Sequence, residues 1–157
     1  MPSRIEIFFS YAHEDQTLMN EVRRQLVLFD RQKVIRKWHD RLISAEDGWK
    51  GQIDRRLRDA RIILLFVSPD FFESDYCFDT EMQEAMRRHT AGQARIIPVI
   101  LRPCLWQTAP FAQFQAVPKD GKPLRTWSNR DEGSLDAATR IMEVVKELRG
   151  AGAPATS

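Results

Sequence analysis

Residues 61–86 of the chain read RIILLFVSPDFFESDYCFDTEMQEAM, and the rest of the sequence is best interpreted from this stretch outward. It opens with an unbroken apolar run from Ile62 to Val67, rich in branched side chains. Such a run is typical of a strand that is buried on both faces, as in a parallel sheet. Because Pro69 has no N–H to donate to a neighbouring strand, we expect the strand to end before it.

A helix is predicted next, beginning near Asp75 or Tyr76, with apolar side chains recurring on one side at positions 78, 82, 85 and 86. The order strand, loop, helix places Glu81 in the first two turns of that helix. In an open parallel sheet, ligands bind outside the carboxyl ends of the strands, so the topology alone puts Glu81 at the functional edge. The alternative is that Glu81 only complements the positive end of the helix dipole, which contributes about 0.3–1 kcal/mol.

Length and composition bound the protein class. With 157 residues, the chain is long enough for one domain and too short for two ordinary ones. Its net charge of +2, from 24 basic and 22 acidic residues, argues against a dedicated nucleic-acid-binding protein. The two cysteines form no CxxC or zinc-site pattern, and neither a signal peptide nor an 18-residue apolar segment is visible. We therefore predict a cytoplasmic domain without membrane or direct nucleic-acid contacts and without a metal site.

The whole chain alternates between strand and helix patterns. Strands are predicted at residues 5–9, 33–38, 62–67, 96–101 and 124–127, and helices at 15–29, 49–60, 75–88 and 135–148. This alternation predicts an α/β, flavodoxin-like three-layer sandwich, with a five-stranded parallel sheet of order 2-1-3-4-5 and helices on both faces. Pro98 places its strand near a sheet edge or at a bulge. Residues 1–149 are predicted to form the domain, and residues 150–157 a flexible tail or linker.

This topology predicts a cleft at the carboxyl ends of the first and third strands, with the loop after the second strand beside it. The walls of the cleft carry Ser10, Tyr11, His13, Trp38, Asp40, Trp49 and Glu81.

The residues of this cleft favour one kind of chemistry over several others. The sequence contains no Walker A, GxGxxG or GxSxG motif, and the first predicted strand is not followed by an acidic pair that would hold Mg²⁺. Cys77, at the amino end of a helix, is a candidate nucleophile, although a small buried packing residue is the alternative. A single carboxylate among aromatic and hydroxyl side chains suits a reaction through an oxocarbenium-like transition state. A cationic leaving group such as nicotinamide needs no second carboxyl group to protonate it.

Four stretches in the expected order resemble a bacterial TIR (Toll/interleukin-receptor) domain. They are IFFSYAHED at 7–15, KWHDRLISAEDGWKGQI at 37–53, ILLFVSPDFFESDYCFDTEM at 63–82, and RIIPVILRPCLW at 95–106 followed by AVPKDGKPL at 116–124. The resemblance implies the flavodoxin-like fold and two possible functions. Many TIR domains cleave NAD⁺ to nicotinamide and ADP-ribose or a cyclic isomer and are activated by self-assembly. Others are non-enzymatic adaptors that only associate with one another.

The resemblance also implies roles for individual residues. Glu81 matches the glutamate of a WxxxE arrangement, in which Cys77 stands where the family often has tryptophan. Glu81 would thus be the catalytic residue of a hydrolase, an NAD⁺ glycohydrolase, and the residues implied to border the nucleotide are Ser10, Tyr11, His13, Trp38, Asp40, Trp49 and Cys77. The so-called BB loop, from Arg41 to Lys50, would gate the site and take part in TIR–TIR contacts. Alternatively, the two tryptophans anchor the core or a loop, and Asp40 fixes its own turn.

The resemblance finally implies partners and a setting. NAD⁺ is expected as substrate, with no further cofactor, and NADP or a related dinucleotide is a weaker alternative. A sensor or oligomerising domain is expected beyond the C-terminus. The implied setting is bacterial antiphage (antiviral) defence by NAD⁺ depletion, and the alternative is signal transduction through an adaptor or interference with host signalling.

Overall fold

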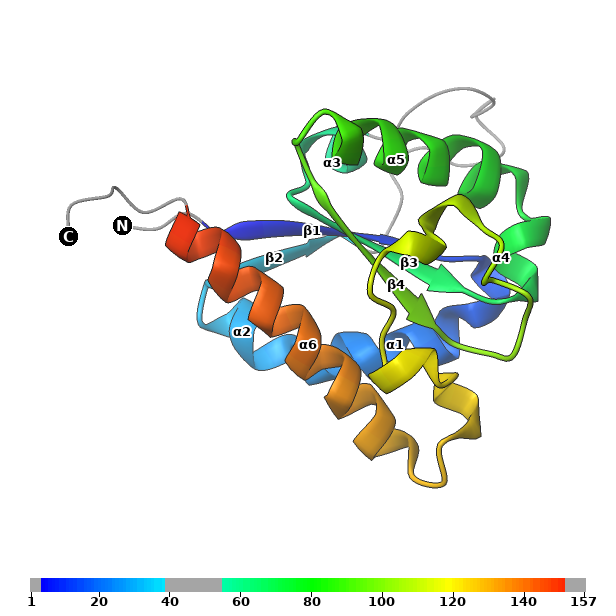
Figure 1. Cartoon of the computed structure of the whole chain (residues 1–157). Coiled ribbons are helices and arrows are strands. Elements are labelled where there is room, and N and C mark those ends of the chain that lie inside the picture. The colour runs from blue at the N-terminus through cyan, green and yellow to red at the C-terminus, as the bar shows by residue number, and fades with distance from the viewer. Residues whose placement is uncertain (1–3, 39–54, 152–157) are drawn as a thin grey trace.

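The computed structural model describes residues 4–38 and 55–151, which form a parallel β-sheet between two layers of helices (Figure 1). The strands are β1 (Ile5–Ser10), β2 (Ile35–Trp38), β3 (Ile62–Val67) and β4 (Arg95–Ile100). The helices are α1 (Gln16–Gln25), α2 (Val27–Arg31), α3 (Arg55–Asp59), α4 (Pro69–Glu73), the π-helix η3 (Asp75–Glu81), α5 (Met82–Thr90) and α6 (Arg130–Ala151). Short 3-10 helices are η1 (His13–Asp15), η4 (Pro110–Gln113), η5 (Lys119–Gly121) and η6 (Leu124–Thr126).

The strand order of the sheet is β2-β1-β3-β4, and every neighbouring pair is parallel. This confirms the first four positions of the predicted order. β3 lies between β1 and β4, and all six of its side chains are buried, as expected for an unbroken apolar run with helices on both sides. Burying each such aliphatic or aromatic side chain contributes about 1.5–3 kcal/mol relative to leaving it exposed. β3 is therefore the centre of the core.

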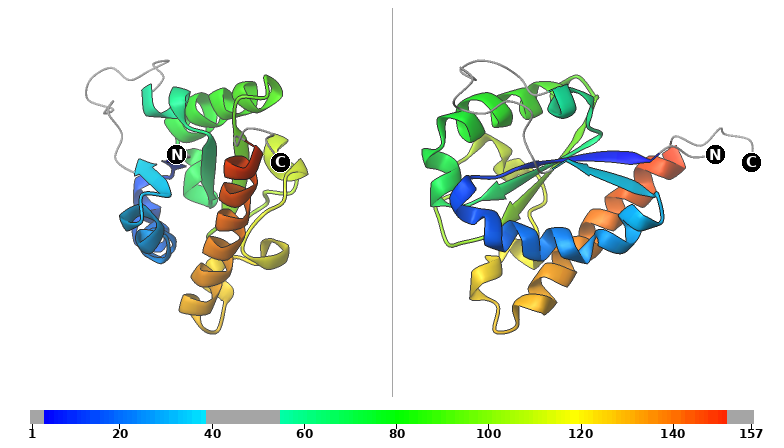
Figure 2. Two further views of the ribbon diagram at one scale, coloured as in Figure 1. Left: turned by 90° about the vertical axis from the view of Figure 1, so that its left-hand side faces the viewer. Right: turned by 180° about the vertical axis from the view of Figure 1, so that it is seen from behind.

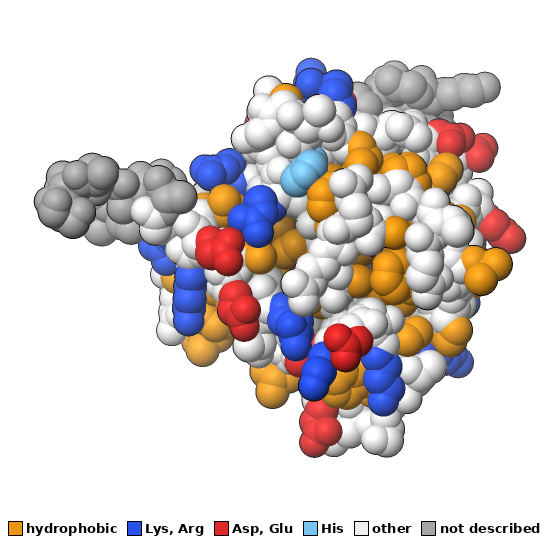
Figure 3. Space-filling view, viewed as in Figure 1, with side chains coloured by type: hydrophobic (Ala, Val, Ile, Leu, Met, Phe, Trp, Pro, Cys, Tyr) orange, Lys and Arg blue, Asp and Glu red, His pale blue; other side chains and the backbone are white. Residues whose placement is uncertain are grey.

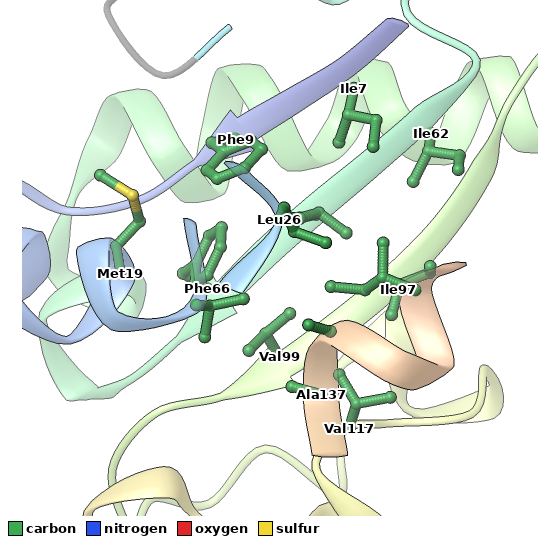
Figure 4. Packing of buried hydrophobic residues seen from close by; sticks show 14 of the residues in the cluster. Ile7, Phe9, Met19, Leu26, Ile62, Phe66, Ile97, Val99, Val117 and Ala137 are labelled. Carbon is green, nitrogen blue, oxygen red and sulfur yellow. The ribbon is translucent and has the colours of Figure 1, made fainter. Parts of the chain in front are cut away.

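Side chains of each strand point alternately to the two faces of the sheet, and this divides the core into two layers. One layer lies between the sheet and helices α1 and α6, where Phe9 and Phe66 pack near Met19, and Ala137 of α6 lies near Val117 (Figure 4). The other layer lies on the opposite face, under α3, η3 and α5, and contains Phe8. Figure 2 shows the two groups of helices on opposite sides of the sheet.

The predicted fifth strand at 124–127 is wrong. Those residues form the 3-10 helix η6, and the sheet of the described residues has four strands. The outer edge of β4 is instead met by one residue, Val117, which accepts from the Ile100 N–H (2.8 Å) and donates to the Pro98 carbonyl (2.9 Å). This pairing stops at once because the next residue, Pro118, has no N–H. Pro98 thus stands in an edge strand, as predicted.

Several helix boundaries differ from the predicted ones for local reasons. The predicted helix at 15–29 forms two helices, α1 and α2. α2 ends at Arg31 because Lys33 adopts a left-handed backbone (φ 63°), and the Val34 N–H closes the helix end by donating to the Phe29 carbonyl (2.9 Å). The last helix begins at Arg130 rather than 135, since the Asn129 side chain accepts from the Asp131 N–H (2.9 Å). Across residues 4–38 and 55–151, none of these helices has the length and apolar character needed to cross a bilayer.

Candidate active site

Ser10 and Glu81 meet at the carboxyl edge of the sheet. Ser10 is the last residue of β1 and lies beside Leu65 of β3 in the parallel register. Its hydroxyl donates a hydrogen bond to Glu81 Oε1 over 2.7 Å, and both side chains are 0% exposed. The structure thus brings together two of the predicted site residues that are 71 positions apart.

Glu81 is held at the junction of the π-helix η3 and α5. The Ser74 hydroxyl caps η3 by accepting from the Cys77 N–H (3.1 Å), and the Met82 N–H donates to the Cys77 carbonyl, five residues earlier. π-Helices are rare overall, but those that occur are frequently found at functional sites. The sequence pattern had predicted only a regular helix here. Glu81 has helical dihedrals (φ −69°, ψ −46°), so η3 continues into α5 without a break and Glu81 lies inside this helical run rather than at its amino end.

The residues that follow β1 do not all face Glu81. Tyr11 is buried in the apolar layer beneath α1, whereas Ser10 contacts Glu81 on the α5 side of the sheet. His13 is exposed at the start of η1. Cys77 is buried and packs in the α5-side layer, as expected for a packing residue.

Trp38 is half-buried at the end of β2, and other side chains of the protein contact both its ring and its N–H. Its Nε1 donates to Glu6 Oε1 (2.9 Å), and the Arg56 guanidinium lies 4.1 Å from the ring centroid. This cation–π contact contributes about 0.5–2 kcal/mol. Stacking of a nucleotide on Trp38 would require Arg56 to move. The other predicted residues of this wall, Asp40, Trp49 and the loop from Arg41 to Lys50, lie outside the described residues.

Sequence reasoning missed a partly buried ion-pair network at the same edge, which we name the three-loop brace: Asp15, Ser68, Asp70 and Arg102. An aspartate directly before a helix commonly caps it, but the Asp15 side chain makes no cap hydrogen bond to α1. It accepts instead from the Ser68 hydroxyl and from Arg102 Nε (3.0 Å). Arg102 also donates to Asp70, and the Ser68 hydroxyl caps α4 by accepting from the Phe71 N–H (3.1 Å).

The brace places one carboxylate in a poorly hydrated position. Asp15 is 2% exposed, and this desolvation raises its pKa above the ordinary value, although the hydrogen bonds from Ser68 and Arg102 act in the opposite direction. Partial burial disfavours the charge on Arg102, yet pairing with Asp70 and Asp15 raises its pKa overall. Arg102 is therefore a permanent cation between two carboxyl groups. Ser68 followed by Pro69 is a helix-start signal that was available from the sequence, but the Arg102 pairing was not.

A separate pocket of about 380 Å³ lies away from this edge, between the start of β4, residues 113–117 and helix α6. Its charged side chains are of both signs, including Arg95, Arg140, Glu143 and Glu147. The molecular face in Figure 3 accordingly shows acidic and basic side chains interspersed over α6. The lining includes no residue near Ser10 or Glu81, so this pocket is not part of the candidate active site. Within the described ranges, no group of three or more histidine, cysteine or acidic side chains is arranged to hold a metal ion.

Comparison with known proteins agrees with the fold. The chain is 47% identical over 155 residues to uncharacterized protein y4lF of Sinorhizobium fredii. The aligned region covers 98% of this chain and 47% of that protein, so the chain spans about half the length of this relative. The crystal structure of the TIR domain of the Toll-related receptor TRR-2 from Hydra magnipapillata matches with a TM-score of 0.56 and 18% identity, covering 89% of this chain and 97% of that one, a likeness of fold alone. A family model described as "TIR domain" matches residues 7–135. The chain therefore belongs to the TIR domain family.

Proposed function

We propose that this TIR domain is an NAD⁺ glycohydrolase in which Glu81 is the catalytic carboxylate. The observation that carries the proposal is the Ser10–Glu81 contact: a wholly buried carboxylate, hydrogen-bonded by a hydroxyl over 2.7 Å, at the carboxyl edge of a parallel sheet. That edge is where open α/β sheets bind ligands.

The proposed reaction breaks the bond between ribose C1′ and the nicotinamide nitrogen. The bonding electrons leave with nicotinamide, whose ring is cationic in NAD⁺ and neutral as a product, so no acid is needed. Positive charge develops on the ribose ring, and the Glu81 carboxylate stabilises it. Water then adds to C1′ and loses a proton, giving ADP-ribose. In the cyclising variant, an adenine nitrogen of the same molecule adds to C1′ in place of water.

In this proposal, a ribose hydroxyl of the substrate takes the place of the Ser10 hydroxyl at Glu81. In the structure Glu81 is 0% exposed, so a substrate reaches it only if Ser10 or a covering segment moves. A ribose hydroxyl that replaced the Ser10 hydroxyl would satisfy the same carboxylate oxygen with the same kind of hydrogen bond. This exchange would link substrate binding to a change at the end of β1.

The proposal includes activation by self-assembly, since an isolated domain with a covered carboxylate is a resting state. The proposed setting is cytoplasmic antiphage defence by NAD⁺ depletion. In this proposal, a sensor or oligomerising domain of the whole protein triggers the assembly. A non-enzymatic interaction module is the second candidate function. The observation that favours it is the same burial, because a carboxylate with no exposure also suits a purely structural contact.

Nicotinamide release from NAD⁺ tests the proposal. It is measured over a range of high protein concentrations, with and without a crowding agent, for wild type, Glu81→Gln and Glu84→Gln. Glutamine keeps the size of the side chain and can still accept from Ser10, but it removes the charge. Glu84 is the matched control because it lies on α5 one turn later and pairs with Arg87 rather than Ser10.

We expect release to rise more steeply than linearly with protein concentration and to fall about 10²–10³-fold in Glu81→Gln, as for other groups that stabilise transition-state charge. Glu84→Gln should retain wild-type activity. Equal activity of Glu81→Gln and wild type would contradict the assignment of Glu81. An assembled, folded wild type that releases no nicotinamide would favour the interaction module.

A further inference from the structure

The segment from Ser10 to Asp15 is fastened at both of its ends by buried side-chain contacts. At the first end, Ser10 donates to Glu81. At the second end, Asp15 is held by Ser68 and Arg102, which are 53 and 87 positions away in the chain. Between them lie Tyr11 and the exposed His13, two residues predicted to border the substrate. Side-chain contacts thus hold the conformation of this part of the site at both of its ends.

Arg102 is well placed to hold the second end. The Leu101 N–H donates to the Val67 carbonyl (2.9 Å), and this bond fixes the chain beside the end of β3 just before Arg102. From there the guanidinium reaches Asp15 of the β1 loop with Nε and Asp70 of the β3 loop with a terminal nitrogen. A planar guanidinium can hold two carboxylates in this fixed arrangement, whereas an ammonium group acts as a single point charge.

The backbone bonds at the second end of the segment are local. The Asp15 N–H donates to the Ala12 carbonyl (2.9 Å) and the Gln16 N–H to the His13 carbonyl, and these bonds join η1 to α1 without reaching another strand or loop. Tyr11 and Ala12 are buried, whereas His13 and Glu14 are exposed, so apolar burial orders the first half of the segment rather than the part next to Asp15. Without Arg102, the Asp15 carboxylate would be left buried without its cationic partner, a state that buried charges avoid by moving toward water.

We propose that Arg102 is a positioning residue for the candidate active site, which acts through Asp15 to keep the segment from Ser10 to Asp15 ordered and Ser10 seated on Glu81. The catalytic part of this inference rests on the proposed NAD⁺ glycohydrolase function, whereas the ordering of the segment does not. Loss of Arg102 leaves Glu81 in place on η3 but requires the loop to become ordered when substrate binds. Such ordering weakens binding more than it slows the chemical step.

The test compares Arg102→Gln with Arg95→Gln. Arg95 is the matched control because it forms an exposed ion pair with Glu147 (3.1 Å) at the start of β4, away from the brace. Hydrogen–deuterium exchange of a peptide covering residues 10–15 measures loop order without any reference to activity. Initial rates of NAD⁺ cleavage over a range of NAD⁺ concentrations give KM and kcat separately. Arg102→Lys is included as the conservative variant and replaces Arg102→Gln if the latter does not fold.

In Arg102→Gln we expect amide exchange in residues 10–15 to rise about tenfold or more, KM to rise about tenfold and kcat to change less than about threefold. Arg102→Lys should fall between this variant and wild type, and Arg95→Gln should match wild type. Equal exchange in Arg102→Gln and Arg95→Gln, or a loss of kcat at constant KM, would overturn the proposal. If wild type cleaves no NAD⁺, the proposed glycohydrolase function is wrong. The role of Arg102 in ordering the segment is then judged from amide exchange alone. Faster exchange confined to residues 10–15 in Arg102→Gln supports that role, and unchanged exchange refutes it.

Discussion

Two buried charges of opposite sign stand at the two ends of helix α5, and their partners differ in kind. Glu81, which immediately precedes the helix, is hydrogen-bonded by a side chain, the hydroxyl of Ser10. Arg88, in the last turn, donates to three backbone carbonyls, those of Leu57 (2.9 Å), Ala60 and Gln93 (3.2 Å). Arg88 complements the negative end of the helix dipole, whereas Glu81 lies six residues after the start of the continuous run of η3 and α5, where the dipole contributes little.

The difference in partners indicates a difference in role. The carbonyls that Arg88 contacts lie at the end of α3, where helices leave backbone acceptors unsatisfied, and after α5. Burial lowers the pKa of Arg88, but a guanidinium remains charged at any physiological pH. Arg88 therefore joins two helix ends permanently. A hydroxyl that donates to a carboxylate, in contrast, is a contact that a ligand hydroxyl can replace.

The largest effect on stability is expected when Arg88 is replaced. Arg88→Met keeps a long apolar side chain but removes every donor, which leaves buried carbonyls unpaired, and we expect the free energy of unfolding to fall by about 2–4 kcal/mol. Denaturant unfolding followed by circular dichroism measures the change. Arg87→Met is the control, since Arg87 is exposed and should change stability by less than about 0.5 kcal/mol. Equal stabilities of the two variants would mean that the Arg88 hydrogen bonds contribute little to folding, so that Arg88 would not have the structural role that distinguishes it from Glu81.

The main elements of the fold could be predicted because they depend on local patterns. The run from Ile62 to Val67 is apolar at every position, and only a strand with helices on both sides buries all of it. Glu81 could be placed at the carboxyl edge because the edge follows from the order of strands and helices. The fifth strand failed for the opposite reason. Whether residues 124–127 or Val117 meets the edge of β4 depends on a partner strand distant in the sequence, not on local composition.

The three-loop brace could not be predicted for the same physical reason. Asp15 precedes a helix, so the local rule assigned its carboxylate to the helix end, but Arg102 and Ser68 compete for it from other loops. The chain holds 24 basic and 22 acidic residues, and no pattern in one sequence selects the pairs that meet. Such long-range polar contacts become visible only when the strand ends are placed in space.

A smaller effect is expected from removing a hydrogen-bond donor to Glu81 rather than the Glu81 carboxylate itself. In Ser10→Ala, a buried carboxylate oxygen loses a hydroxyl donor, and a hydrogen bond to a charged group contributes about 1.5–3 kcal/mol. Ser134→Ala is the control, because Ser134 is also buried but donates to a neutral carbonyl, that of Asp131 (3.1 Å), a bond that contributes about 0.5–1.5 kcal/mol. The two variants are compared by denaturant unfolding near neutral pH. If Ser134→Ala is the less stable, the Ser10–Glu81 contact contributes little to folding.

The smallest effect is expected at the ion pair of Glu84 and Arg87 on the same helix, in which Arg87 is exposed and Glu84 is partly buried. The hydrogen bond from Arg87 lowers the pKa of Glu84 below its ordinary value, with partial burial acting against it. A carboxyl group whose pKa is lower in the folded state stabilises the protein above its unfolded pKa, near 4.5, and this contribution disappears as the pH falls through the folded value. Thermal unfolding of wild type and Glu84→Gln should thus differ slightly at neutral pH and converge in acid. In about 1 M salt, where charges are screened within about 3 Å, the difference at neutral pH should shrink as well. A difference that persisted in acid would show that Glu84 stabilises the helix through packing rather than through its charge. The differences among Glu81, Glu84 and Arg88 would then not be explained by electrostatics alone.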